Sequence, residues 1–196
     1  MRLSILAVLI LATGCVDALK SEYPERRYFT LAAQRPGEPA PSGKESVLRV
    51  RRFTASKLSE GSELVTRTGE TEYETDFYNQ FFAPPATQLT EQAHRWLGAS
   101  GLFSAVVGTG SSVPETHILE GNVTSLYVDQ RSSSAVLEIQ FMLVRVSSEP
   151  AAVLFQKSYR EVSTGAQGPE TCVRGWNAAL GRILAALEGD LAKVKK

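Results

Sequence analysis

The sequence has few of the residues that usually build metal centres and nucleophilic active sites. Its 196 residues include only two cysteines and two histidines. Neither His94 nor His117 has another histidine, a cysteine or a carboxylate at metal-ligand spacing, so the sequence predicts no zinc site. It also contains no Gly-x-Ser-x-Gly turn and no phosphate-binding glycine loop. We therefore expect no catalytic residues, no metal and no cofactor, and a structural role for both histidines.

An excess of charge of either sign is also absent. The chain has 21 Lys plus Arg residues and 21 Asp plus Glu residues. Proteins that bind nucleic acid normally carry a basic excess, so we expect no nucleic-acid partner. The hydrophobic fraction of 43% is ordinary for a folded protein, and the length is sufficient to bury a core.

The N-terminus has the layout of a secretory signal peptide. Arg2 is a short positive region, and an apolar run from Leu3 to Leu11 follows it. The small residues Ala12, Thr13 and Gly14 come next, as before a cleavage site. The apolar run is too short for a spanning helix, so residues 1–14 are predicted to be a removed leader.

Cys15 follows the small residues at once, and Leu11 to Cys15 resembles the lipobox of bacterial lipoproteins, with Ala12 where Leu is usual. A thiol at a new N-terminus can carry a diacylglycerol, and several acyl chains (palmitate, for example) anchor a protein firmly. We expect Cys15 to be the lipid attachment site. Val16, in place of an aspartate, favours delivery to the outer membrane. The alternative is an ordinary signal peptide with an incidental cysteine.

Two other features could carry a function. Cys172 opens the last predicted helix, where a lowered thiol pKa is conceivable, but a small buried residue on the apolar face is the favoured interpretation. Acidic side chains alternate along a predicted strand, at Glu70, Glu72, Glu74 and Asp76. Such a strip is usually a solvated face or a guard against edge-to-edge pairing, and it binds a basic partner less often.

Hydrophobic alternation predicts a series of strands. The clearest is Ala135–Val146, in which Leu137, Ile139 and Phe141 alternate with polar residues. Gly121 is expected to mark a bulge in another strand. The predicted strands are Tyr28–Ala32, Val47–Phe53, Leu64–Thr68, Thr71–Tyr78, Phe103–Val107, Ile118–Val128, Ala135–Val146 and Val153–Val162.

Helical spacing predicts two helices, one beginning at Pro84 and Pro85 and ending near Gly98, and a second after Pro169. Strands followed by a helix, twice over, predict an α+β fold: a mainly antiparallel sheet with two amphipathic helices packed on one face. Residues 15–27 are predicted to be the lipidated cysteine and a tether, and residues 28–196 a single periplasmic domain.

Seven stretches of the mature chain form a pattern through their order and spacing: Tyr28–Leu31, Val47–Val50, Phe53–Ala55, Leu64–Arg67, Tyr78–Pro85, Leu97–Phe103 and Leu119–Val123. Through these stretches the chain resembles the ABC-type transport auxiliary lipoproteins, the PqiC/YmbA-like family. The chain departs from the family pattern at Phe82, where tryptophan is usual, and at Thr66, where tyrosine often precedes Arg67.

The resemblance implies a non-catalytic lipoprotein, anchored to the outer membrane and facing the periplasm. Its partner would be the MCE-domain (mammalian cell entry) protein of an ABC system that moves phospholipid or other hydrophobic molecules between membranes. A homo-oligomer is plausible in such a family. We expect Phe81, Phe82 and Pro85 to set the strand-to-helix corner rather than to touch lipid.

Two other functions stay open. The chain could be a structural lipoprotein of a different envelope-assembly complex, which neighbouring permease, ATPase and MCE genes would argue against. A secreted enzyme would need a cleft of converging polar groups, and the scattered histidines and cysteines do not suggest one.

Overall fold

The computed structural model describes residues 25–38, 45–146 and 150–194 of the chain. Two α-helices and a nine-stranded sheet account for most of this part. The helices are α2 (Pro85–Ala99) and α3 (Pro169–Val194), with a short 3-10 helix, η2 (Lys57–Ser59). The strands are β1 (Arg27–Phe29), β2 (Val47–Val50), β3 (Thr54–Ala55), β4 (Glu63–Arg67), β5 (Tyr73–Phe81), β6 (Ala105–Val107), β7 (His117–Asp129), β8 (Ser134–Arg145) and β9 (Ala152–Thr164).

Strand β7 organises the sheet. Along one edge it pairs with β8, which pairs with β9, and both ladders are long and antiparallel. Its other edge is shared in turn by β2, β3 and β4, which all run parallel to it. The α+β fold is confirmed, and the sheet is mixed rather than purely antiparallel. Alternation along a strand shows which side is buried, but it carries no information on the direction of the neighbouring strand.

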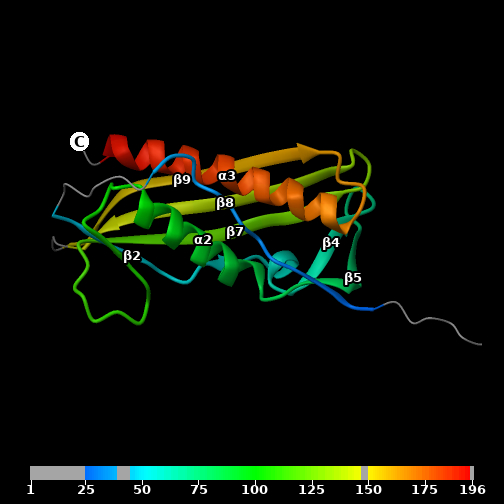
Figure 1. Ribbon diagram of the computed structural model, residues 1–196, viewed down its shortest axis with the longest axis horizontal. Coiled ribbons are helices and arrows are strands. Elements are labelled where there is room, and N and C mark those ends of the chain that lie inside the picture. Colours follow the sequence, from blue (N-terminus) through cyan, green and yellow to red (C-terminus); the bar gives the residue numbers. More distant parts are fainter. Residues whose placement is uncertain (1–24, 39–44, 147–149, 195–196) are drawn as a thin grey trace, which may run out of the picture.

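Both helices cover the same face of the sheet, as expected (Figure 1). The buried side of β8, formed by Leu137, Ile139, Phe141 and Leu143, faces this layer and is fully enclosed. From α3, the predicted apolar stripe supplies most of the opposite wall. Its buried members are Val173, Trp176, Leu180, Ile183, Leu184, Leu187 and Leu191.

Gly121 has a different role from the predicted one. The bulge in β7 lies between Val123 and Ser125, not at the glycine. The ring of Phe53 lies 2.6 Å from where a Cβ of Gly121 would be. The glycine therefore allows a ring to lie directly against the sheet backbone, where it stacks edge-on with Phe141 at 5.6 Å.

The chain after β1 leaves the sheet and runs between the two helices, as Figure 1 shows. We call residues 30–33 the crossing segment. Gln88 and Gln92 of α2 accept hydrogen bonds from the backbone N–H groups of Leu31 and Ala33, at 2.7 and 3.1 Å. Asn177 of α3 accepts one from Ala32 at 2.9 Å. Side-chain amides therefore take the place of a neighbouring strand, and the strand predicted to reach Ala32 ends at Phe29.

Candidate functional site

The predicted lipid attachment site, Cys15, lies outside the described residues, which begin at Glu25. Its acylation therefore stays a prediction. In the described part of the chain, no helix is both long and apolar enough to cross a membrane.

The two histidines lie on different elements. His94 is a half-buried residue of α2, beside Thr90 and Arg95 at a shallow cavity. His117 begins β7, where its Nδ1 lies 2.8 Å from the hydroxyl of Thr116 and its ring contacts Phe103. Among residues 25–38, 45–146 and 150–194, no three His, Cys, Asp or Glu side chains are grouped so as to hold a metal ion. His117 is thus tied to its neighbours by a polar and a ring contact, whereas His94 lines the cavity.

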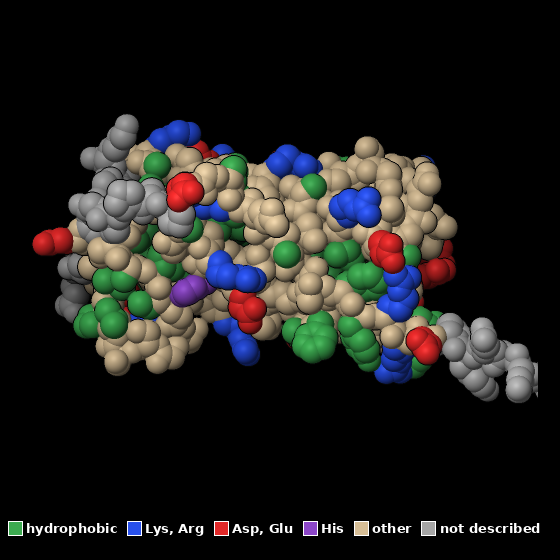
Figure 2. Space-filling model, in the orientation of Figure 1, with side chains coloured by type: hydrophobic (Ala, Val, Ile, Leu, Met, Phe, Trp, Pro, Cys, Tyr) green, Lys and Arg blue, Asp and Glu red, His purple; other side chains and the backbone are tan. Residues whose placement is uncertain are grey.

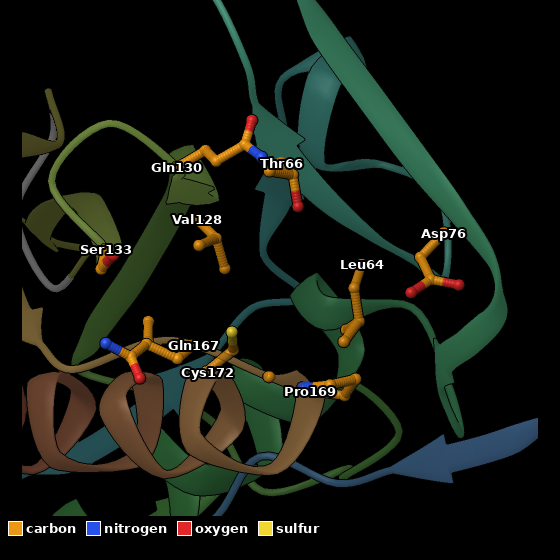
Figure 3. Close-up of a pocket in the computed structure, with 11 residues that line it drawn as sticks. Leu64, Thr66, Asp76, Val128, Gln130, Ser133, Gln167, Pro169 and Cys172 are labelled. Atoms are coloured by element: carbon orange, nitrogen blue, oxygen red, sulfur yellow. The ribbon is translucent and has the colours of Figure 1, made fainter.

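Cys172 lines a cavity of about 420 Å³ at the start of α3. Figure 3 shows its sulfur directed toward the same space as Leu64 and Val128, with Gln167 entering from the turn before the helix and Pro169 from the first residue of α3. The thiol is buried, and this burial raises the pKa of Cys172. A raised pKa keeps the thiol protonated and poorly nucleophilic, so the cavity is not the site of an activated cysteine.

Asp76 stands at the far side of this cavity (Figure 3), but its carboxylate is already engaged. One oxygen accepts hydrogen bonds from the backbone N–H groups of Tyr78 and Asn79, at 2.9 and 3.0 Å. The other accepts one from the Asn79 side chain at 2.8 Å. These bonds hold a bulge in β5, where the pairing with β4 shifts from Asp76 opposite Leu64 to Gln80 opposite Glu63. Asp76 therefore shapes the backbone.

The predicted acidic strip is shorter than expected. Strand β5 begins at Tyr73, so Glu70 and Glu72 lie in the turn that precedes it. Only Glu74 and Asp76 lie on the strand itself, and Asp76 has the backbone role just described. Of the two strand residues, Glu74 is exposed and Asp76 is partly buried.

The residues that were expected to build the strand-to-helix corner differ in their burial. Phe81 is 2% exposed and packs against Trp176, with ring centres 5.5 Å apart, and Pro85 is also buried. Phe82 is directed toward solvent, with 76% of its surface exposed. Phe81 and Pro85 are therefore packed at the corner as expected, and the ring of Phe82 is not. Consecutive residues of an extended chain point to opposite sides, so only one of the two rings can enter the core.

Comparison with known proteins gives one family. The model of the family described as "ABC-type transport auxiliary lipoprotein component" matches residues 29–188. No curated protein matches the sequence. The match covers every described element from the end of β1 into α3.

Solved structures share the fold at low sequence identity. Protein XCC0632 from Xanthomonas campestris, a DUF330 family protein, superposes with a TM-score of 0.74 at 16% identity, covering 86% of this chain and 96% of that one. The hypothetical protein CT253 from Chlamydia trachomatis superposes with a TM-score of 0.53 at 10% identity, covering 76% and 98%. At these identities the likeness concerns the fold alone.

Proposed function

Because the chain belongs to the ABC-type transport auxiliary lipoprotein component family, we propose that it is a non-catalytic part of an ABC system with an MCE-domain partner. In this proposal the system moves phospholipid or another hydrophobic molecule between the two membranes of the envelope. The family match over residues 29–188 is the observation that carries the proposal.

The N-terminal sequence supports the location. Residues 1–14 would be removed as a leader, Cys15 would carry the lipid, and Val16 favours the outer membrane over the inner one. Residues 15–27 would then tether a single periplasmic domain formed by residues 28–196.

The surroundings of the candidate reactive groups favour a docking or structural role over catalysis. The Cys172 thiol has a raised pKa, and Asp76 is committed to backbone hydrogen bonds. A catalytic site needs a nucleophile, a base and an orienting group within hydrogen-bond reach of one another. The described residues around the α3 cavity do not bring such groups together.

Co-purification from the native host tests this proposal. The full-length protein, with a C-terminal tag, would be extracted from membranes in mild detergent, and its partners and N-terminal peptide identified by mass spectrometry. We expect an MCE-domain protein, bound phospholipid and an acylated Cys15. Cys15→Ser is the matched control, and we expect it to lose the acylated peptide and the outer-membrane fractionation.

Other results would contradict one part of the proposal and support another. An acylated Cys15 with partners from a different envelope complex would keep the lipoprotein and contradict the transport role, in favour of an assembly function. An unmodified Cys15 in the soluble fraction would contradict the anchor itself. A protein that sizes as several copies would support a homo-oligomer.

A further inference from the structure

Exposed aromatic side chains are gathered at one place on the described surface. The exposed aromatic residues are Tyr28, Tyr73, Phe77, Tyr78 and Phe82, whereas the other large exposed hydrophobic side chains are valines. Tyr28 belongs to β1, Phe82 follows β5 directly, and the other three belong to β5. Strands β1 and β5 are neighbours in the sheet. One edge of the molecule therefore carries its exposed rings.

Four of these residues form two ring pairs on these neighbouring strands. We define the aromatic patch as Tyr28, Phe77, Tyr78 and Phe82. Tyr28 meets Phe82 edge-on at 6.4 Å, and Phe77 meets Tyr78 at 5.3 Å. The guanidinium of Arg26, just before β1, lies over the Phe77 ring at 4.0 Å and places a cation beside the second pair.

The backbone is arranged to expose these rings. The bulge in β5 comprises residues 77–79, and the Asp76 carboxylate fixes it through the N–H groups of Tyr78 and Asn79. Phe77 and Tyr78 are 57% and 39% exposed as a result, while Phe81, four residues further on, is in the core. Bulges of this kind redirect side chains at sheet edges.

The patch has the composition of a membrane-interface surface. Tyrosine and phenylalanine place an apolar ring among lipid headgroups and acyl chains, and arginine is attracted to anionic headgroups. In Figure 2, hydrophobic side chains lie beside Lys and Arg side chains along the lower right edge of the molecule. Arg27, adjacent to Arg26, adds a second cation there, and it forms an ion pair with Glu170.

The position of the patch in the chain identifies the surface that it meets. Arg26 is separated from Cys15 only by residues 16–25, and such a segment spans at most roughly 40 Å when fully extended. A lipid on Cys15 would keep the patch within that distance of the bilayer. The several acyl chains of the anchor would already hold the protein at the membrane, so a contact by the patch would set the orientation of the domain rather than its attachment.

We infer that the aromatic patch and Arg26 rest on the phospholipid surface of the membrane that holds the anchor. This inference rests on the proposed lipidation of Cys15. The contact would fix the orientation of the domain, with β1 and β5 toward the lipid. The C-terminal end of α3, which lies at the opposite end of the molecule from β1 in Figure 1, would then point away from the membrane.

Lipid quenching of an introduced tryptophan tests the inference. The full-length acylated protein carrying Phe82→Trp would be reconstituted into vesicles of phosphatidylethanolamine and phosphatidylglycerol, with or without lipids brominated near the headgroup. Native Trp96 and Trp176 are 4% and 0% exposed and give a constant background. We expect the bromolipid to remove about half of the added emission, with a shift to shorter wavelength. Adding Arg26→Gln should reduce this quenching in anionic vesicles.

Val153→Trp is the matched control, because Val153 is 59% exposed and lies at the start of β9, outside the patch. We expect its emission to be quenched by acrylamide and not by bromolipid. A tryptophan at position 82 with the same behaviour would overturn the inference. Protection from both quenchers, together with association of copies on sizing, would overturn it in favour of a contact between two protein molecules.

The mass of the N-terminal peptide separates this test from that of the proposed function. An unmodified Cys15 with strong bromolipid quenching would contradict the anchor and keep the membrane contact. An acylated Cys15 with no quenching at position 82 would keep the anchor and contradict the contact.

Discussion

Strands β7–β9 and the crossing segment both contact the helical layer, but their backbone hydrogen bonds are satisfied in different ways. The three long strands bond to one another along regular ladders, and apolar side chains fill the space beneath α3. The crossing segment has no strand beside it, so Gln88, Gln92 and Asn177 accept its N–H groups. The first region depends on apolar burial, and the second depends on particular amide side chains from distant helices.

Trp176→Ala should weaken the strand region most. Trp176 is fully buried, stacks against Phe81, and donates a hydrogen bond from Nε1 to the carbonyl of Val136 at 3.1 Å. We expect a loss of about 4 kcal/mol in the free energy of unfolding, measured by urea denaturation, because a large cavity remains and the hydrogen bond to Val136 is lost. Trp176→Phe keeps most of the packing, and a loss as large as that of the alanine variant would contradict this explanation.

Gln88→Leu should act on the crossing segment. The side chain accepts from Leu31 N–H and donates to the Ala83 carbonyl, each at 2.7 Å, and both groups would lose their partner. We expect a loss of about 2 kcal/mol. Hydrogen exchange at Leu31 should accelerate more than exchange in β8, which would show that the two regions are separable. Glu91→Leu, at an exposed position of α2, is the control and should have little effect.

Glu188 joins the chain beyond the crossing segment to both helices. Its carboxylate accepts a two-pronged hydrogen bond from Arg35, at 2.8 and 3.0 Å, and another from Nε1 of Trp96 at 2.7 Å. We expect Glu188→Gln to reduce the free energy of unfolding by about 1 kcal/mol, since the group is partly exposed. Glu170, at the other end of α3, should show no comparable loss when changed to glutamine, because its ion pair with Arg27 is exposed.

The contact between β9 and α3 should depend on pH through Asp190. Hydrogen bonds from Lys157, Lys193 and Tyr159 lower the pKa of Asp190. A lowered folded-state pKa stabilises the protein above the unfolded value of about 3.9, and this contribution is lost as the pH falls below it. The difference in stability between the native protein and Asp190→Asn should therefore shrink from about pH 6 to about pH 3, as followed by urea midpoints. A constant difference would contradict the assignment.

At high pH, Tyr159 gives the stability the opposite dependence on pH. Burial and the hydrogen bond to Asp190 raise the pKa of Tyr159. Its contribution is therefore present below the unfolded value of about 10 and is lost only as the pH rises toward the folded-state value. The same denaturation series, extended above pH 10, would show a steeper loss for the native protein than for Tyr159→Phe.

The sequence by itself determined the helices and strands whose buried residues recur at a regular spacing along the chain. The apolar stripe of α3 and the alternation from Leu137 to Leu143 are local patterns, and both elements formed where they were predicted. The predicted leader and the predicted lipidation of Cys15 also rest on local sequence signals, and they stay predictions because residues 1–15 lie outside the described residues.

Only the tertiary structure decided which elements meet. The parallel pairing of β2, β3 and β4 with β7, and the path of the crossing segment between α2 and α3, join residues far apart in the sequence. The burial of Phe81 and the exposure of Phe82 depend on how β5 enters the corner. The need for a glycine at position 121 depends on the Phe53 ring that packs against it. A hydrophobic pattern predicts that a side chain is buried, but the residues that this side chain contacts depend on the packing of the whole chain.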